Sequence, residues 1–212
     1  MHNASPTAQL GPIVTPELYA HAVATGDDEL AAHYAAQLDA ADQARDERLA
    51  GPGALVSAAA YYVHQGLRVL PLQPGSKLPL PAALTCCGGS HRHGCTDALA
   101  DLGAVHAWWR EHPDANVGVA TGHLVDVIDQ DGPAGAVAWV RGTWPPVLGI
   151  ATTARGAGGV HRYIAATGRG NGQKIAPGID YRGTGGYVVA PPSVVDGRRY
   201  AWAQVLQLDV AA

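Results

Sequence analysis

Two aspartates at the end of a short apolar run are the residues of this sequence that most plainly suggest chemistry. Residues 124–131 read LVDVIDQD. Alternate residues of a β-strand share a face, so Asp129 and Asp131 are expected on one side, with carboxylates roughly 6–7 Å apart along the strand. Because neighbouring acids repel each other, a cation should lie between them. Mg²⁺ is the natural candidate, since it binds a few carboxylates and completes its shell with water and phosphate. The alternative is a solvated turn, because Gly132-Pro133 follows directly.

A glycine-rich stretch that leads into a histidine is the second candidate. Residues 155–163 read RGAGGVHRY. Gly158 and Gly159 allow a ligand to approach the backbone closely, and His161 beside two arginines could hold a triphosphate. The alternative for a histidine in a strand is a packed or exposed side chain without a ligand.

A lone acid on a further apolar segment is the third candidate. Asp180 lies between Ile179 and Tyr181, and burying an unpaired carboxylate is costly, so it needs a partner. Arg182 could be that partner, which would make the acid structural. A metal ion shared with the two aspartates at the end of the first run is the other interpretation.

The elements that must position these residues form a mixed pattern rather than a regular alternation, which predicts an α+β fold. Helices are expected at residues 16–24, 27–50, 54–65, 101–111 and 134–141 from apolar spacing, acidic first turns and terminal glycines. Strands are expected at residues 67–72, 117–121, 124–128, 149–153, 159–165, 179–181, 187–190 and 199–202.

Composition indicates a globular chain of 212 residues, 47% hydrophobic and without phenylalanine. No apolar run approaches the length of a membrane span, and the start lacks the pattern of a secretory signal, so we expect a cytoplasmic protein without membrane contact. The net charge of −4 argues against strong nucleic-acid binding. However, residues 141–200 hold eight basic and two acidic residues, whereas residues 1–50 hold two and eight. A phosphate-facing surface in the C-terminal half would explain this asymmetry, which could also be incidental.

Read in order, these motifs resemble the prim-pol family, the bifunctional DNA primase/polymerase domain of the archaeo-eukaryotic primase superfamily. The matching pieces are GSKLPL at 75–80, WW at 108–109, PDANVGVATG at 113–122, DQD at 129–131, GGVH at 158–161 and the segment 177–193. They cover about residues 54–202. The resemblance implies an RRM-like catalytic sheet, packed with an N-terminal α/β module, and an active site in the cleft between them.

The resemblance also implies roles for the candidate residues. Asp129, Asp131 and Asp180 match the acids that hold two Mg²⁺ or Mn²⁺ ions for catalysis, and His161 matches a histidine that contacts nucleotide phosphates. The basic candidates for binding the triphosphate are Arg182, Lys174, Arg155 and Arg162. Because the arginines that neighbour a strand histidine alternate in direction, we rank Arg182 and Lys174 above Arg162.

The implied activity is synthesis and extension of primers on a single-stranded DNA template from NTPs or dNTPs. Such a domain would form the N-terminal part of a phage, plasmid or mobile-element replication protein, with a helicase further along a longer chain. The segment itself contains no G-x-x-x-x-G-K-[ST] motif, so no P-loop ATPase is expected within it. Two alternatives remain: a catalytically inactive nucleic-acid-binding module, and a metal-dependent phosphodiesterase, because clustered acids also serve nucleases.

A cluster of possible zinc ligands lies in the irregular stretch 73–97. Zn²⁺ takes four nitrogen or sulfur ligands, and five are available: Cys86, Cys87, His91, His93 and Cys95. Three cysteines in a chain expected in the cytoplasm disfavour a disulfide framework. We therefore expect a structural zinc site here, against the alternative of a flexible loop with free thiols. The expected organisation is a leader and helical extension at 1–50, the catalytic domain at 51–205 and a tail at 206–212.

Overall fold

The computed structural model describes residues 14–49, 51, 53–80 and 98–208. Its helices are α1 (Pro16–Thr25), α2 (Asp28–Leu49), α3 (Ala54–His64), α4 (Leu102–Glu111) and α5 (Gly132–Arg141), with a short 3₁₀ turn η2 (Gly156–Gly158). Its strands are β1 (Val69–Leu72), β2 (Asn116–Ala120), β3 (Val125–Gln130), β4 (Val147–Thr152), β5 (Val160–Ala165), β6 (Gly172–Ala176), β7 (Ile179–Arg182), β8 (Tyr187–Val189), β9 (Val194–Val195), β10 (Arg198–Arg199) and β11 (Ala201–Gln204). This mixed architecture confirms the α+β prediction.

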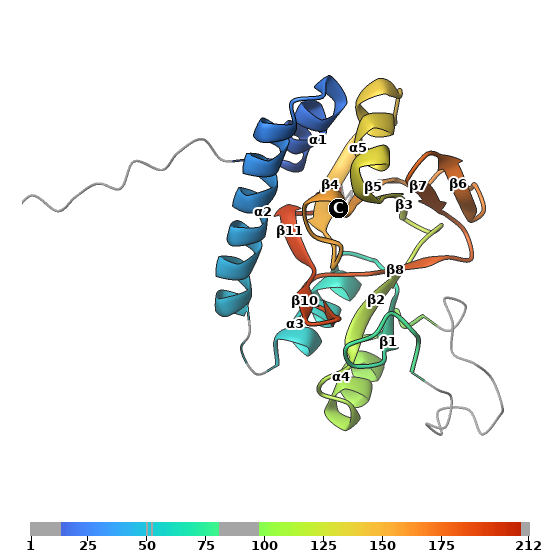
Figure 1. The fold of residues 1–212 in the computed structure, drawn as a ribbon. Coiled ribbons are helices and arrows are strands. Elements are labelled where there is room, and N and C mark those ends of the chain that lie inside the picture. Colours follow the sequence, from blue (N-terminus) through green and yellow to red (C-terminus); the bar gives the residue numbers. More distant parts are fainter. Residues whose placement is uncertain (1–13, 50, 52, 81–97, 209–212) are drawn as a thin grey trace, which may run out of the picture.

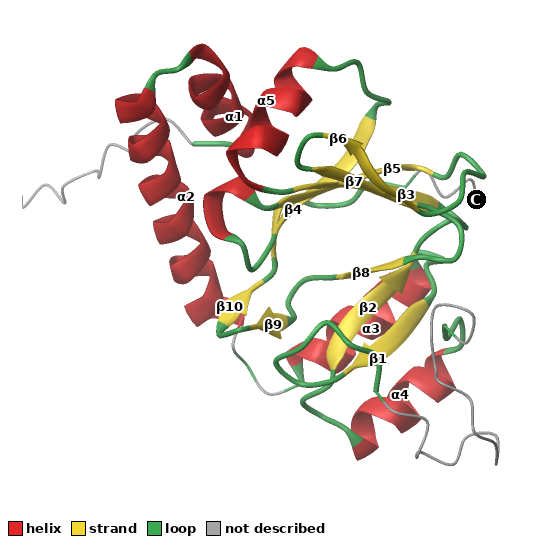
Figure 2. Ribbon diagram, turned by 45° about the vertical axis from the view of Figure 1, so that its right-hand side comes forward, coloured by secondary structure: helices red, strands yellow, loops and turns green. Residues whose placement is uncertain are grey.

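Two antiparallel sheets organise the molecule. The larger has the strand order β11-β4-β5-β3-β7-β6, the smaller has the order β1-β2-β8, and β9 and β10 form a separate two-stranded ribbon. Figure 2 shows α1, α2 and α5 on one side of the six-stranded sheet, and the three-stranded sheet with α3 and α4 on its other side. Strand β3 lies at the centre of the larger sheet, between β5 and β7.

The face of the six-stranded sheet that α5 covers is apolar over most of its area. Ile128, Ile164 and Ile179 are buried there, and Trp139 of α5 packs against them. Helix α1 packs in turn against α5 and α2, so the N-terminal helices form an outer layer beside it (Figure 1). The fold therefore buries this side of the sheet under helices.

The opposite face changes character along β3. Val125, Val127 and Tyr163 are buried in a core that they share with Tyr62 of α3 and Trp109 of α4. Further along the same strand, beyond this core, the next residue on that face is Asp129, because side chains alternate along a strand. The sheet is thus packed on the smaller module at one end and open at the acidic end.

Local signals explain most helix boundaries. Thr15 caps α1 by accepting a hydrogen bond from the Leu18 N–H (3.4 Å), and Gly26 ends that helix in the left-handed region at φ 74°. Asp101 accepts from the Ala104 N–H (2.9 Å) and caps α4 as expected. No helix in the described part of the chain has the length and apolar character needed to cross a membrane.

Three β elements differ from expectation. Strand β6 was not expected, because its stretch is rich in glycine and lacks alternation, and neither was β9, which is only two residues long. The single strand expected at 199–202 is divided into β10 and β11, with Tyr200 between them. The domain boundaries stay predictions.

Candidate active site

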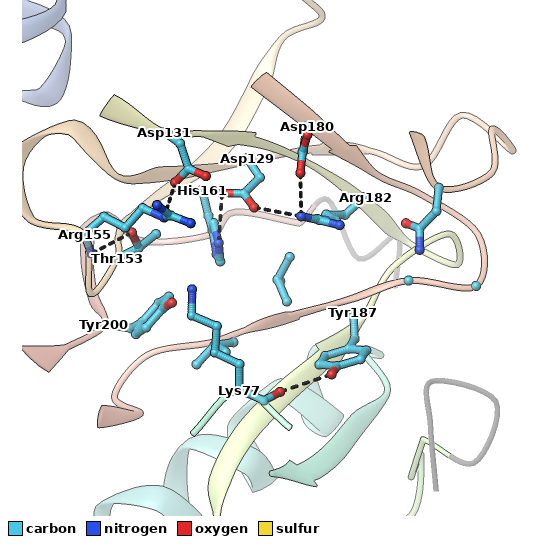
Figure 3. A pocket seen from close by; sticks show the side chains of 15 residues that line it. Lys77, Asp129, Asp131, Thr153, Arg155, His161, Asp180, Arg182, Tyr187 and Tyr200 are labelled. Atoms are coloured by element: carbon cyan, nitrogen blue, oxygen red, sulfur yellow. Dashed lines mark hydrogen bonds and ion pairs between the residues drawn. The ribbon is translucent and has the colours of Figure 1, made fainter. Parts of the chain in front are cut away.

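The centre of the site is set by the register of three neighbouring strands. Asp129 of β3 lies directly opposite His161 of β5 on one side and directly opposite Asp180 of β7 on the other. Directly opposed residues of a sheet share a face. The three side chains therefore project to the same side of the sheet, although they come from distant parts of the sequence (Figure 3).

These residues line a cavity of about 410 Å³ between the two sheets. The six-stranded sheet and its adjoining turns contribute Asp129, Asp131, Thr153, Arg155, His161, Asp180 and Arg182. Lys77 and the segment Tyr187–Val189 line the opposite wall, and Tyr200 closes one end. The cavity therefore combines three acids with one lysine and two arginines.

Arginines pair with all three acids. Arg182 Nη2 lies 2.8 Å from Asp180 Oδ2 and 3.3 Å from Asp129 Oδ2, and Arg155 Nε lies 2.7 Å from Asp131 Oδ1. Asp180 Oδ1 also accepts a hydrogen bond from the Lys174 backbone N–H (2.7 Å). Asp180 is half-buried, and its charged partner is Arg182, as expected if this acid is structural.

His161 is a buried and neutral member of the site. Its side chain is 6% exposed, and its Nε2 lies 3.5 Å from Asp129 Oδ1. Burial lowers the pKa of the imidazole; Asp129 opposes this shift, whereas Lys77 and Arg182 add to it. At neutral pH the ring is therefore uncharged, and it can donate one N–H to the carboxylate or to a bound ligand.

Asp131 continues the strand geometry just beyond β3. Its backbone is extended (φ −125°, ψ 122°), and although it precedes α5 its side chain makes no cap hydrogen bond. Burial raises the pKa of this carboxyl group, and the charge of Asp129 raises it further, while Arg155 and Lys77 lower it. The repulsion between neighbouring acids that the sequence suggested thus contributes to the raised pKa of Asp131.

The acids fit a divalent metal in their chemistry, since carboxylate oxygens are the donors that Mg²⁺ and Mn²⁺ prefer. The raised pKa of Asp131 also indicates that added positive charge would be favourable here. However, no group of three or more acid, histidine or cysteine side chains within the described ranges is arranged to hold a metal ion. The carboxylates of Asp129, Asp131 and Asp180 instead point to arginine side chains. The expected zinc ligands Cys86, Cys87, His91, His93 and Cys95 lie outside the described residues.

Arg162 does not belong to the cavity, which corrects its place among the nucleotide-binding candidates. It lies on the helix-covered face and is fully buried. Its Nη1 donates to Gln130 Oε1 (2.7 Å), its Nη2 lies 3.4 Å from Glu17 Oε1, and its guanidinium lies 4.0 Å from the centre of the Trp139 ring. Strand alternation, which turns Arg162 away from His161, is the reason.

Lys174 lies beside the cavity rather than in it. It lines a neighbouring hollow that shares Asp131 and Asp180 with the main cavity, and its backbone adopts φ 55°, in the left-handed region. Its described contribution to the site is the backbone hydrogen bond to Asp180. The role of its side chain stays a prediction.

The glycines before His161 pack against protein, contrary to the expectation that a ligand would approach them. A Cβ added to Gly158 would lie 2.8 Å from the Gly132 Cα, and one added to Gly159 would lie 2.6 Å from the Arg155 Cβ. Such distances leave no room for a side chain, so both glycines permit close packing of the turn.

Sequence reasoning did not assign a role to Lys77, Thr153 or Tyr200, which all line the cavity. For Lys77 a signal was present, because it belongs to the GSKLPL motif of residues 75–80. Nothing in the sequence indicated that Thr153 and Tyr200 would line the cavity, since that depends on the pairing of β11 with β4 and of β4 with β5.

A cavity that joins acids suited to divalent metals with cations suited to phosphate is typical of enzymes that transfer nucleotidyl or phosphoryl groups. The sequence matches the profile of the Prim-Pol family, bifunctional DNA primase/polymerase, N-terminal, over residues 58–211. Because this match covers well over half of the chain, the protein belongs to the Prim-Pol family. No curated protein matches the chain.

Family membership suggests DNA primase/polymerase activity of the nucleotidyltransferase type, on DNA and nucleotides. Prim-Pol domains are generally dependent on divalent metals. Helices α1 and α2 lie outside the matched range, although α1 packs against α5.

Proposed function

We propose that this chain is a DNA-dependent primase/polymerase that synthesises and extends primers on single-stranded DNA. The observation that carries the proposal is the position of Asp129, directly opposite both Asp180 and His161 in one cavity. A phosphate-binding site alone would have no need of three clustered acids, whereas metal-dependent transfer of a nucleotide does.

Asp129, Asp131 and Asp180 would hold two Mg²⁺ or Mn²⁺ ions. When bound, such ions activate the primer 3′-hydroxyl and stabilise the leaving pyrophosphate. In the transfer, the 3′-oxygen would form a bond to the α-phosphorus, the bond from this phosphorus to the bridging oxygen of the β-phosphate would break so that pyrophosphate leaves, and the hydroxyl proton would pass to solvent water. His161, held beside Asp129, would donate an N–H to a phosphate oxygen.

The arginines have a second role in this proposal. Arg182 and Arg155 form ion pairs with the acids and neutralise part of their charge. Divalent ions bound to the carboxylates would take over that neutralisation, which would release both guanidinium groups for the triphosphate. Arginine suits this exchange because its planar fork binds carboxylate and phosphate equally well.

A primer-extension assay tests the proposal. Wild-type protein should extend a primer on single-stranded DNA with NTPs or dNTPs when Mg²⁺ or Mn²⁺ is present, and chelation should stop the reaction. Asp129→Ala should abolish incorporation while its circular dichroism spectrum and melting temperature stay close to those of the wild type. Full extension by this variant would refute the assignment, and degradation of the DNA would favour the phosphodiesterase.

A second candidate, a catalytically inactive nucleic-acid-binding module, has one specific observation in its favour. All three acids are already paired with arginine, so each has a cationic partner within the chain itself. Binding of single-stranded DNA with no incorporation at any concentration of Mg²⁺ or Mn²⁺ would identify this module.

Two further proposals concern the longer protein to which this domain would belong and a zinc site. We infer that the domain is the N-terminal part of a phage, plasmid or mobile-element replication protein with a helicase further along the chain, and that residues 86–95 bind a structural zinc ion. Stoichiometric zinc in purified protein would support the last point, and metal-free protein with an unchanged melting temperature would exclude it.

A further inference from the structure

Lys77 is the cation that faces the acids from the other side of the cavity. It lies in the turn that follows β1, in the module of the three-stranded sheet, whereas Arg155 and Arg182 belong to the six-stranded sheet and its turns. Figure 3 shows its side chain extending from the lower wall toward the groups around His161. The cavity is thus bounded by acids on one wall and by a lysine on the other.

The backbone around Lys77 is firmly held. The Asn116 side-chain amide donates to the Ser76 carbonyl (3.0 Å), the Gln73 N–H donates to the Leu78 carbonyl (2.8 Å), and the Tyr187 hydroxyl donates to the carbonyl of Lys77 itself (3.1 Å). These bonds come from three separate parts of the small module. The turn therefore presents the lysine from a fixed position, while the side chain remains solvent-accessible.

The charge of Lys77 is not used in an ion pair. The two arginines that line the cavity are both paired: Arg155 with Asp131, and Arg182 with Asp129 and Asp180. No ion pair within the described residues includes Lys77. Its field nevertheless reaches across the cavity, since it lowers the pKa of both Asp131 and His161.

We propose that Lys77 binds the phosphates of the incoming nucleoside triphosphate from the wall opposite the acids. This inference rests on the proposed function and deepens it. An ammonium group on a flexible stem suits a phosphate ligand as a point charge. The nucleotide would lie between the two sheets, so that both modules hold it. The competing source of phosphate is the backbone of the template or primer.

Single-nucleotide extension kinetics test this role. Lys77→Ala should raise the KM for the nucleotide by roughly ten- to hundredfold, as expected for loss of a charged contact, with kcat within a few-fold of wild type. Lys77→Arg should restore most of the affinity. The matched control is Arg110→Ala, which removes one exposed positive charge from α4 in the same module, and both of its constants should stay within about twofold.

Binding measurements show whether Lys77 contacts the phosphates of the nucleotide or those of the DNA. They also test the role of Lys77 independently of primer extension. Titration with dTTP should show weaker binding to Lys77→Ala than to wild type, with a smaller difference for the nucleoside. The dissociation constant for single-stranded DNA should not change. Weaker binding of DNA with unchanged binding of dTTP would overturn the assignment, as would an unchanged KM. If wild-type protein does not extend primers, the proposed function fails, while the dTTP titration still decides whether Lys77 binds a triphosphate.

Discussion

The two faces of the six-stranded sheet carry the same kinds of charged residue in different surroundings. On the helix-covered face, Asp126 and Arg162 are completely buried. On the face toward the smaller module, Asp129 and Arg182 have side chains that are 16% and 25% exposed and line the cavity. Both aspartates lie on β3 and both arginines on the strands next to it, so their place in the sheet order does not explain the difference in burial.

The two aspartates differ in the groups that contact their carboxylates. One oxygen of Asp126 accepts hydrogen bonds from the Thr167 N–H (2.8 Å), the Thr167 hydroxyl (3.0 Å) and the Tyr181 hydroxyl (2.6 Å). Asp129 has Arg182 at 3.3 Å and His161 at 3.5 Å, and both are themselves beside the cavity. Fixed neighbours thus hold Asp126 through one of its oxygens, whereas the other oxygen has no hydrogen-bond partner among the described residues. The partners of Asp129 line the cavity and can be exchanged for a ligand.

The largest expected effect comes from the two aspartates. Asp129→Asn should lower nucleotide incorporation by about three orders of magnitude, since loss of a metal ligand costs several kcal/mol of transition-state stabilisation, with little change in stability. Asp126→Asn should lower the free energy of unfolding by about 1–3 kcal/mol, because buried donors lose a charged acceptor. Urea denaturation and primer extension on the same preparations measure both quantities. Equal behaviour of the two variants would remove the distinction between the faces.

A smaller effect is expected from the two arginines. Arg162→Met should destabilise the protein by about 1–3 kcal/mol, because it leaves the buried Gln130 side chain without its partner and removes the contact with Trp139. Arg182→Met should change stability by less than about 1 kcal/mol, as expected for a partly exposed ion pair, but should reduce incorporation about tenfold or more.

The control for this pair is specific activity. Incorporation by the folded fraction of Arg162→Met should match that of the wild type, because the guanidinium does not reach the cavity. A loss of activity in that variant without loss of stability would place Arg162 back among the nucleotide-binding residues.

Much of this arrangement follows from local sequence patterns. Apolar runs and caps located the five α-helices of the described residues and most of their strands. Alternation correctly indicated that arginines beside His161 could not all face the same way. The grouping of Asp129, Asp180 and His161 was reached through family resemblance, because strand order depends on long-range pairing. Lys77 could not be placed at the acids from the sequence, since its position depends on how the two sheets pack.

The smallest expected effect concerns the stability of the metal-free protein. The pKa of the Asp131 carboxyl group is raised by burial and by the charge of Asp129, so the folded state holds this proton more tightly than the unfolded chain does. At neutral pH, where the group is ionised, its charge therefore costs stability. In the presence of chelator, Asp131→Asn should raise the free energy of unfolding at pH 7 by less than about 1 kcal/mol after solvent screening.

The pH dependence gives this prediction its sign. The stabilising effect of Asp131→Asn should shrink as the pH falls through the raised pKa and vanish below the usual value of about 3.8. On the covered face the corresponding change, Asp126→Asn, should lower stability at pH 7. If Asp131→Asn makes the protein more stable but lowers nucleotide incorporation, this acid serves catalysis and does not contribute to folding. A loss of stability in Asp131→Asn at pH 7 would instead make this acid part of the scaffold.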